Sequence, residues 1–538
     1  MKADSNWTWT NKSLRLLARE DGSYEWVSPS DYRVAEVRLL HSVEAVGEVH
    51  AERDRARDNL LIRGDALNGL TTLLELPEFA REYAGKVKLV YLDPPFNTQQ
   101  SFLHYDDALE HSVWLTMMRD RLLLLKTLLA PDGSIYVHCD TSEGHYLRVL
   151  LDEIFGRENF RNEIIWKRQT AHSDAKRYGP IHETLYYYAK SSETRFRINY
   201  VPYDESYIDS HYSLRDEDGR RYQLGDLTAR GPRPGLSYTF HGIDPPPGRV
   251  WATLPDKMEE LFQQGKIVFT GKGTPRRKRY LDEMPGTALQ DLWTDIPAVN
   301  SQAGEATTYA TQKPEGLLKR IVEASSGEGD IVLDCFAGSG TTAAVAHKLG
   351  RRWVLVEWSR ETIEDFTKPR LGRIINGEDR GGISKQAAWD QRGGFRLLEV
   401  APSMFDASNG QVFLSEWATN GKLAEATAAQ LHYDYQPQPP FCGLRGRARL
   451  AVIDGLINAA VVQLLVNALG ESERLVVCGT AVDPGARGIL KELRPGSSVR
   501  KIPQSILRDY HHAVRAARPA LAAPVSQPVT EPPAGVPG

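Results

Sequence analysis

Short apolar runs that end in an acidic residue or a glycine are the most regular pattern along the chain. Buried strands of a parallel sheet carry apolar residues on both faces, so such runs are typical of them. The pattern predicts strands at 59–65, 87–92, 330–334 and 353–356. Apolar residues at helical spacing predict helices at 67–76, 315–325 and 341–349. The alternation of strand and helix indicates an α/β fold.

The stretch between the second and third of these strands continues the pattern and then loses it. It predicts a helix at 112–129, a turn at Pro131–Gly133, a strand at 134–138, a helix at 144–155 and a strand at 162–166. From 191 to 300 proline, glycine, arginine and aromatic residues accumulate, and Gly231–Gly235 and Pro245–Gly248 mark loops. We therefore expect an inserted domain at 191–300.

The C-terminal third carries a weaker pattern and no recognisable motif. Residues 449–463 are mostly apolar and are expected to be helical, followed by a strand at 474–479, a helix at 486–493 and a strand at 498–502. These elements suggest a small α/β module within 381–516, suited to dimerisation or to docking a partner. Residues 517–538 are rich in proline and alanine and are expected to be disordered.

Composition is that of a globular protein. The chain has 538 residues, 41% hydrophobic and 25% charged, with a net charge of −4. No run approaches the roughly 20 apolar residues of a membrane span, and residues 1–12 lack the apolar core of a secretory signal. Cys139, Cys335, Cys442 and Cys478 stand far apart without metal-ligand spacing, so we expect buried thiols, no disulfide, no zinc and a cytoplasmic location.

The tetrapeptide Asp93-Pro94-Pro95-Phe96 directly follows the apolar strand at 87–92. Two prolines have a fixed φ and no N–H, so they hold a short extended segment whose carbonyls are free to accept hydrogen bonds. The segment thus offers one carboxylate, rigid backbone acceptors and one aromatic face at the end of a strand. An amino group on a nucleobase, with two N–H donors and a ring that stacks, fits this arrangement.

A glycine turn follows the strand at 330–334. The sequence Asp334-Cys335-Phe336-Ala337-Gly338-Ser339-Gly340 leads into the helix at 341–349, and the next strand ends in Glu357. Gly338 and Gly340 allow a tight turn and a close approach of a ligand to the helix N-terminus, and Glu357 is placed to bind ribose hydroxyls. The pattern indicates an adenosine cofactor. Read with Ala343 it also satisfies an NAD-binding motif, whereas a P-loop is excluded because no lysine follows the second glycine.

Two further segments accompany these motifs. Thr311-Gln312-Lys313-Pro314 opens the helix at 315–325, where a proline near the first position is also common in ordinary helices. Asp65 ends the strand at 59–65 and is equally suited to a ligand contact or to an N-cap.

Taken together, these four segments resemble the β class of S-adenosylmethionine-dependent DNA amino-methyltransferases, which act on N6 of adenine or N4 of cytosine. In that class the Asp-Pro-Pro-aromatic motif precedes the Phe-x-Gly-x-Gly motif, as it does here. Segments 279–286 and 292–296 also resemble type III modification subunits and their solitary relatives. The resemblance covers about 59–375, and Phe96 stands where tyrosine is commoner.

The resemblance implies a doubly wound, mostly parallel Rossmann-like sheet with circularly permuted motif order. It also implies a division of the chain into an N-terminal extension (1–58), a catalytic half (59–190), a target-recognition insert (191–300), a cofactor-binding half (301–380), the C-terminal module and the tail. The implied catalytic residues are Asp93, Pro94, Pro95 and Phe96. The implied S-adenosylmethionine site comprises Asp65, Lys313, Asp334, Phe336, Gly338, Gly340 and Glu357.

Double-stranded DNA is the implied partner, and a homodimer and a restriction subunit are compatible with the resemblance. A basic run within the insert, without an acidic residue between Lys266 and Tyr280, would face DNA, and so would a second cluster near the catalytic half. The basic run in the insert consists of Lys272, Arg276, Arg277, Lys278 and Arg279. The second cluster consists of Lys167, Arg168, Lys176 and Arg177. His138 and His145 are expected to be a strand-end and a helix-surface residue.

The activity implied is methylation of the N6 amino group of a flipped-out adenine. Three alternatives stay open. Methylation of N4 of cytosine uses the same chemistry, but in that family serine more often replaces the aspartate. An NAD-dependent oxidoreductase would use the glycine turn and Glu357 and leave the Asp93 motif unused. A non-catalytic DNA-binding module would require a decayed motif, and none is visible.

Overall fold

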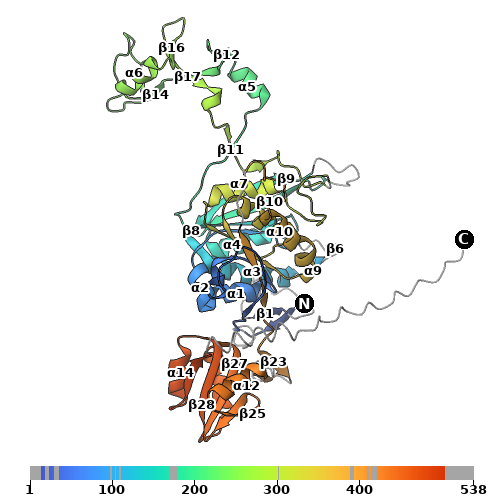
Figure 1. The fold of residues 1–538 in the computed structure, drawn as a ribbon. Coiled ribbons are helices and arrows are strands. Elements are labelled where there is room, and N and C mark those ends of the chain that lie inside the picture. Colours follow the sequence, from blue (N-terminus) through green and yellow to red (C-terminus); the bar gives the residue numbers. More distant parts are fainter. Residues whose placement is uncertain are drawn as a thin grey trace, which may run out of the picture. The chain divides into compact units, whose positions relative to one another are not determined.

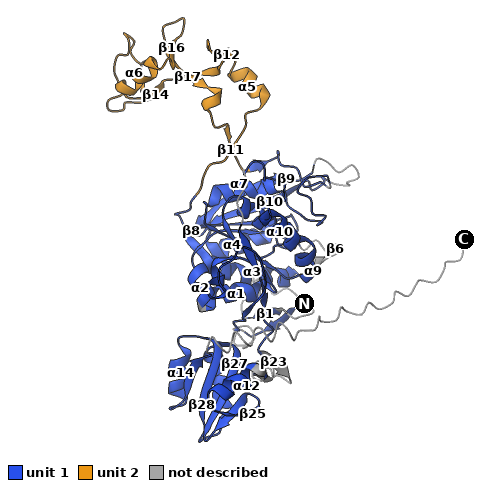
Figure 2. Cartoon of the chain, in the orientation of Figure 1, with its two compact units in different colours: residues 1–195, 292–538 blue, residues 196–291 orange. Residues whose placement is uncertain are grey.

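The computed structural model describes residues 14–18, 24–28, 36–96, 100–102, 105–107, 111–169, 178–300, 302–387, 393–408, 411–414 and 421–502. The chain forms two compact units (Figure 2): residues 196–291 make the smaller one, and residues 1–195 with 292–538 make the larger. The tail expected at 517–538 lies outside the described residues, as do Lys176 and Arg177. No described helix is long and apolar enough to cross a membrane.

The larger unit contains a ten-stranded sheet, of which β8, β9 and β10 are labelled in Figure 1. Its strand order is β19-β9-β10-β8-β5-β20-β21-β4-β22-β3. All strands run parallel except β10 and β3. Their bounds are β19 Leu292–Trp293, β9 Phe160–Lys167, β10 His182–Ala189, β8 Leu129–Cys139, β5 Val87–Leu92, β20 Ile331–Asp334, β21 Arg352–Glu357, β4 Asn59–Arg63, β22 Gly394–Val400 and β3 Leu40–Gly47. The expected doubly wound, mostly parallel sheet is confirmed.

Helices cover this sheet in two groups. One group packs α1 against α2 and α3, and α3 against α4; the other packs α7 and α10 against α8. Right-handed crossovers place α3 (β5 to β8) and α8 (β20 to β21) on opposite faces, because the two connections run in opposite directions along the sheet. The bounds are α1 Ala66–Glu75, α2 Pro77–Tyr83, α3 His111–Leu128, α4 Gly144–Phe155, α7 Glu315–Ser325, α8 Thr341–Lys348, α9 Arg360–Thr362 and α10 Lys368–Ile375. The 3₁₀ helices are η1 Glu52–Arg57 and η2 Arg157–Asn159, and η4 Ile363–Thr367 is π-helical.

The reversal of strand order between β5 and β20 determines where a ligand can bind. From β5 the chain moves to β8 on one side, and from β20 it moves to β21 on the other. In open α/β sheets ligands bind at such a switch point, at the carboxyl ends of the strands. β5 ends before Asp93, β20 ends at Asp334 and β21 ends at Glu357. Three of the expected site residues are therefore brought to one edge of the sheet.

Two local expectations for this unit need correction. The turn expected at Pro131–Gly133 lies inside β8, where the pairing with β5 jumps from Val87↔Leu129 to Leu89↔Ser134. The strand thus absorbs the extra residues as an irregularity in its pairing. Strand β10 was not expected at all, although His182–Ala189 carries leucine and three tyrosines, residue types that favour strands.

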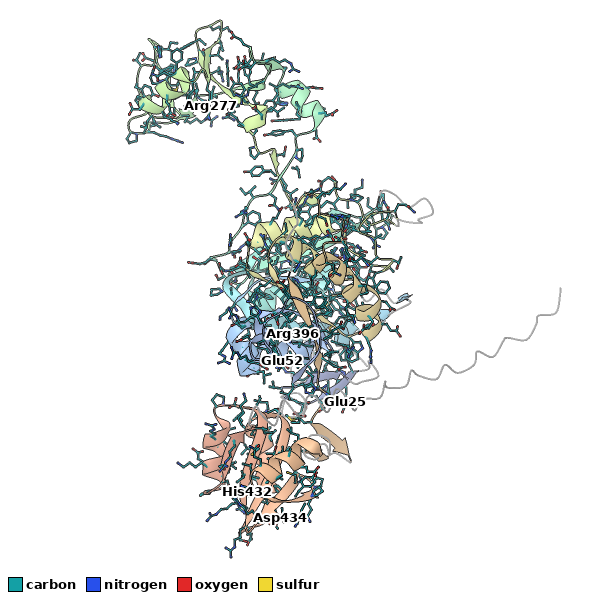
Figure 3. The ribbon with its side chains drawn as sticks, in the orientation of Figure 1. Glu25, Glu52, Arg277, Arg396, His432 and Asp434 are labelled. Atoms are coloured by element: carbon teal, nitrogen blue, oxygen red, sulfur yellow. The ribbon has the colours of Figure 1, made fainter. Side chains whose placement is uncertain are left out.

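The edges of the sheet use residues from outside the expected methyltransferase halves. β3 belongs to the expected N-terminal extension and pairs antiparallel with β22. β22 belongs to the stretch expected to form the C-terminal module, yet it pairs in parallel with β4. Arg396 of β22 contacts Glu52 at 2.7 Å, and the two residues are labelled together in Figure 3. A two-stranded sheet precedes them, β1 Arg15–Ala18 with β2 Tyr24–Val27, and β6 Gln100–Phe102 pairs with β7 Tyr105–Asp107.

The smaller unit is built from short strands around a small apolar core. Leu227, Phe240, Trp251, Met258 and Leu261 are among the buried core residues. A four-stranded antiparallel sheet has the order β12-β13-β17-β16. The bounds in this unit are β11 Tyr200–Val201, α5 Glu205–His211, β12 Leu214–Arg215, β13 Arg221–Gly225, β14 Thr228–Arg230, β15 Arg249–Trp251, α6 Pro255–Gln263, β16 Ile267–Phe269, β17 Pro275–Tyr280, η3 Leu281–Glu283 and β18 Thr287–Ala288.

The C-terminal residues form a separate five-stranded sheet of order β25-β26-β27-β28-β29. The helix expected at 449–463 is wrong for its first half: Ala448–Ile457 is the strand β27, and α13 covers only Ala459–Asn467. Periodicity cannot separate a fully buried strand from a buried helix, and β27 is buried between two neighbouring strands. The other bounds are β23 Phe405–Ser408, β24 Gln411–Leu414, α12 Lys422–Gln430, β25 Asp434–Gln438, β26 Phe441–Arg445, β28 Arg474–Val482, α14 Ala486–Leu493 and β29 Ser498–Lys501.

Candidate functional site

The Asp93–Phe96 segment leaves the sheet at the end of β5, whose residues are almost wholly buried. The indole Nε1 of Trp114 on α3 donates a hydrogen bond of 2.7 Å to the carbonyl of Pro95. None of the described residues donates to the carbonyl of Pro94. The two proline carbonyls therefore have different roles. The Pro95 carbonyl fixes the segment to α3, and the Pro94 carbonyl can accept a hydrogen bond from a ligand.

The two oxygens of the Asp93 carboxylate have different surroundings. Oδ2 accepts a hydrogen bond of 2.7 Å from the Lys313 ammonium, in an ion pair whose side chains are 18% and 9% exposed. Oδ1 is buried and has no hydrogen-bond partner among the described residues. A buried, unpaired carboxylate oxygen is costly unless a donor arrives. Asp93 is thus held by one oxygen and open at the other.

The Phe96 ring completes this corner of the site. It is partly buried against the core, with the Lys313 Nζ 5.0 Å from its centroid and the His138 ring 5.9 Å away. The Phe96 ring thus lies beside Lys313, the residue that pairs with Asp93. The sequence placed Lys313 with the cofactor residues, whereas the structure brings its ammonium to Asp93.

The glycine turn between β20 and α8 uses the left-handed backbone region at both expected positions. Gly338 has φ of +48° and Gly340 has φ of +77°. A Cβ at Gly338 would lie 3.3 Å from the Tyr309 ring, and a Cβ at Gly340 would lie 2.9 Å from Thr367 Cγ2. Only glycine meets both the backbone and the space requirement, so the turn can pass close to a ligand.

Two acidic residues flank this turn. Asp334 accepts from the Phe336 N–H at 2.9 Å and from the Thr342 hydroxyl at 2.6 Å. Burial, with smaller contributions from Asp93 and Glu357, raises the pKa of Asp334 to about 7. Glu357 accepts from the Gly338 N–H at 2.9 Å, and burial raises its pKa as well.

Asp65 has the environment of a helix cap. Its Oδ1 accepts from the N–H groups of Leu67 and Asn68 at the start of α1, at 2.9 and 3.4 Å. Its Oδ2 pairs with the buried Arg121 guanidinium. Both oxygens are engaged within the protein, so the structure favours the N-cap over a direct ligand contact.

Three residues near Asp93 were not predicted from the sequence as part of the site. Glu183 is the second residue of β10, and its carboxylate lies 4.0 Å from Lys313 Nζ and 2.8 Å from His138 Nε2. His138 is wholly buried and its Nδ1 lies 2.9 Å from the Tyr91 hydroxyl, whereas His145 is exposed on α4. Trp114 holds Pro95. No local motif marks these residues, because pairing between strands brings them together.

The basic run at 276–279 lies on the central strand β17 of the smaller unit, which includes Arg277 in Figure 3. Side chains alternate along a strand, so the run divides between two faces. On one face Arg276 lies 3.7 Å from Asp226, and Lys278 lies 3.1 Å from Asp216. On the other face are Arg277 and the exposed Arg279, for which no ion pair is present among the described residues.

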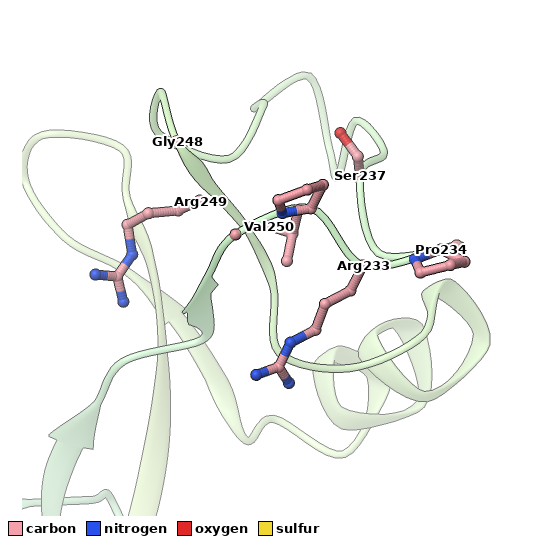
Figure 4. Close-up of a pocket in the computed structure, with 9 residues that line it drawn as sticks. Arg233, Pro234, Ser237, Gly248, Arg249 and Val250 are labelled. Atoms are coloured by element: carbon pink, nitrogen blue, oxygen red, sulfur yellow. The ribbon is translucent and has the colours of Figure 1, made fainter.

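The remaining basic candidates differ in their partners. Lys272 is exposed in the loop between β16 and β17. Lys167 is half-buried at the end of β9, and Arg168 next to it pairs with Glu183 at 2.6 Å. Lys176 and Arg177 lie outside the described residues. The smaller unit also has a groove whose lining includes Arg233 and Arg249 (Figure 4).

Groups of histidine, cysteine or acidic side chains that could hold a metal are absent from the described part of the chain. The four cysteines are buried and unpaired. The site therefore consists of an open carboxylate oxygen, a free proline carbonyl and an aromatic ring, with a glycine turn and two acidic residues along the same sheet edge.

Comparison with known proteins places these features in a family. Residues 87–368, a little over half of the chain, match the family model described as "DNA methylase". The chain is similar to the probable type III restriction-modification enzyme HindVI Mod subunit of Haemophilus influenzae, at 32% identity over 67% of this chain and 56% of that protein. It is also similar to the type II methyltransferase M.EcaI of Enterobacter cloacae, at 34% identity over 51% of this chain and 62% of that protein.

A third relative is the DNA adenine methyltransferase YhdJ of Escherichia coli, at 25% identity over 64% of this chain and 94% of that protein. The chain spans 56% and 62% of the lengths of the first two relatives. The matched residues include the Asp93 motif, Lys313, the glycine turn and Glu357. The family expected from the order of the motifs is thereby confirmed: this chain belongs to the DNA methylase family.

Proposed function

We propose that this protein transfers a methyl group from S-adenosylmethionine to the N6 amino group of adenine in double-stranded DNA. The observation that carries the proposal is the buried Oδ1 of Asp93, which has no hydrogen-bond partner among the described residues. Asp93 follows β5, and β5 is the neighbour of β20, the strand that leads into the glycine turn. The family supports DNA methylation as the reaction class. Aspartate, rather than serine, at this position favours adenine.

The amino group of adenine needs activation, because its lone pair is delocalised into the ring. The base must also leave the helical stack before it can enter a protein site. In the proposed complex Asp93 Oδ1 and the Pro94 carbonyl accept the two amino protons, and Phe96 stacks on the ring. These hydrogen bonds draw the nitrogen toward tetrahedral geometry and localise its lone pair. Positioning and electrostatic preorganisation supply the rest of the rate enhancement.

The residues around the glycine turn fit S-adenosylmethionine. Gly338 and Gly340 keep side chains out of the turn, and Glu357 presents a carboxylate at the end of β21 for ribose hydroxyls. Asp334 and Phe336 line the same turn, and Asp65 shapes the neighbouring start of α1. When bound, the cofactor supplies an electrophilic methyl group. Lys313 has a different role in this proposal, since it fixes Asp93 Oδ2 and leaves Oδ1 to the substrate.

The smaller unit, residues 196–291, is the proposed target-recognition domain. Arg277, Arg279 and Lys272 are its proposed DNA contacts, because Arg276 and Lys278 already face acidic partners. Lys167 is the proposed DNA contact beside the catalytic half, because the guanidinium of Arg168 already pairs with Glu183. The printed names of several relatives are Mod subunits of type III restriction-modification enzymes. We accordingly extend the proposal to a cytoplasmic enzyme that forms a homodimer and works with a restriction subunit.

The test combines one variant with one matched control. Asp93→Ala should abolish methyl transfer to DNA and leave S-adenosylmethionine binding within about threefold of wild type by calorimetry, because the cofactor residues are untouched. Asp330→Ala removes a carboxylate just before β20, at the opposite edge of the same sheet, and should keep the activity. Mass spectrometry of hydrolysed DNA identifies the methylated base.

Each outcome has a defined meaning. N6-methyladenine produced by wild type and by Asp330→Ala, but not by Asp93→Ala, supports the proposal. N4-methylcytosine would replace adenine by cytosine as the substrate and leave the roles of the residues intact. Methyl transfer by Asp93→Ala within a few-fold of wild type would refute the catalytic assignment.

A further inference from the structure

Glu183 reaches the ligand edge of the sheet because β10 runs against its neighbours. A parallel strand brings its last residues to the carboxyl edge, whereas an antiparallel strand brings its first residues there. In the pairing of β10 with β9, Glu183 lies opposite Trp166, and in the pairing with β8 the next residue, Thr184, lies opposite Cys139. The Glu183 side chain is only 4% exposed, so a carboxylate is buried at the entrance to the site.

Both oxygens of Glu183 face positive or protonatable groups. Oε1 lies 2.6 Å from the Arg168 guanidinium. Oε2 lies 4.0 Å from Lys313 Nζ and 2.8 Å from His138 Nε2. Burial by itself would raise the pKa of Glu183, but Lys313, His138 and Arg168 together lower it well below its usual range. The carboxylate is therefore charged at any working pH.

A row of alternating charges runs from the surface to the reacting corner. Arg168, whose side chain is 43% exposed, is followed by Glu183, then Lys313 and then Asp93. Lys313 lies within 4.0 Å of both carboxylates, at 2.7 Å from Asp93 Oδ2 and at 4.0 Å from Glu183 Oε2. Opposite charges at these distances interact strongly where water is excluded. The ammonium is thus shared between two anions.

We propose that Glu183 is a positioning residue for the methyl-transfer site, sharing the Lys313 ammonium with Asp93 and linking that ammonium to Arg168. The inference rests on the proposed function, since it assigns Asp93 the role described there. Without the Glu183 charge, Lys313 is bound by Asp93 alone. The ion pair then tightens, and Asp93 becomes a weaker acceptor for the amino protons of the substrate.

Several charged and titratable groups surround Glu183, and a substitution that tests its charge must leave them in place. They are His138 on β8 with the Tyr91 hydroxyl behind it on β5, Arg168 after β9, Lys313 before α7 and, through Lys313, Asp93. Glu183→Gln keeps the size of the side chain and an oxygen for Arg168 while removing the negative charge. Glu163→Gln, at an exposed position on the neighbouring strand β9, is the matched control.

Steady-state kinetics give the first readout. In Glu183→Gln we expect kcat to fall about tenfold, because Asp93 becomes a weaker acceptor for the amino protons of the substrate. The dissociation constants for S-adenosylmethionine and DNA should stay nearly unchanged, which separates a positioning role from a structural one. Glu163→Gln should behave as wild type in both respects.

The second readout does not depend on activity. In protein labelled with ¹³C at lysine Cε, the Lys313 resonance, identified by its loss in Lys313→Arg, should move in chemical shift in Glu183→Gln relative to wild type, because the ammonium loses one of its two anionic neighbours. An unmoved Lys313 resonance overturns the inference, whatever the kinetics show. A moved resonance in Glu183→Gln, combined with a wild-type protein that methylates no DNA, would support the sharing of the ammonium and refute the proposed function. Loss of kcat together with loss of cofactor binding would reduce Glu183 to a structural residue and also overturn the inference.

Discussion

Asp334 is a buried acid whose charge should lower the stability of the cofactor-free protein. Both of its oxygens accept hydrogen bonds, from the Phe336 N–H and the Thr342 hydroxyl, yet burial raises its pKa from 3.8 to about 7. The substitution Asp334→Asn keeps an oxygen for Phe336 and offers an NH₂ group to Thr342, whose hydroxyl can turn to accept. The variant therefore removes the charge while keeping the shape and the hydrogen bonds.

The sign and size of the effect follow from proton linkage. Between about pH 4 and 7 the folded state binds the Asp334 proton more tightly than the unfolded state, so wild type loses stability as the pH rises through this window. Above pH 7 the free energy of unfolding of wild type is lower by about 4 kcal/mol, at about 1.4 kcal/mol per pKa unit. More than half of this difference should appear between about pH 5 and 7.5.

Urea unfolding of wild type and Asp334→Asn at these two pH values measures the difference directly. The variant should gain on wild type as the pH rises and should gain no more above about pH 8. Asp365→Asn, at an exposed position in η4, is the matched control and should show no such gain. A difference between variant and wild type that is the same at both pH values would show that Asp334 is not a perturbed acid, and the reasoning from burial would be refuted.

Two further predictions address the glycine turn and the smaller unit. Gly338→Val should lower S-adenosylmethionine affinity at least about tenfold by calorimetry, because the turn needs positive φ and leaves little space for a side chain. Gly329→Val, also at positive φ but in open space, is the control. Normal binding by a folded Gly338→Val would show that the cofactor site was assigned to the wrong place. Changing Arg277 and Arg279 together to alanine should flatten the log–log salt dependence of DNA binding by roughly two units, one per phosphate contact. The same double change at the two acid-paired cations of β17 should flatten it less, and equal slopes would contradict the assignment of faces.

Local sequence was sufficient for most elements of the cofactor and catalytic halves. The helices expected at 315–325 and 144–155 and the strand expected at 87–92 have these bounds in the structure, and the strand expected at 59–65 ends two residues earlier, at Arg63. Each is long or strongly apolar and is bounded by glycine, proline or an acidic residue, so local propensity and burial favour the same element. The prediction was wrong at 449–463, because a fully buried strand and a buried helix have the same apolar composition.

The order of the motifs determined the family and the proposed reaction, because the Asp93 segment and the glycine turn each carry their chemistry within a few consecutive residues. What those residues contact was decided only by the tertiary structure. Parallel strands meet at one edge of the sheet and bring Asp93, Asp334 and Glu357 together there, while the antiparallel β10 brings Glu183 to the same edge. Lys313 is 220 residues from Asp93 in sequence and 2.7 Å from it in space. No local pattern encodes such a contact, since it depends on which strands become neighbours and in which direction they run.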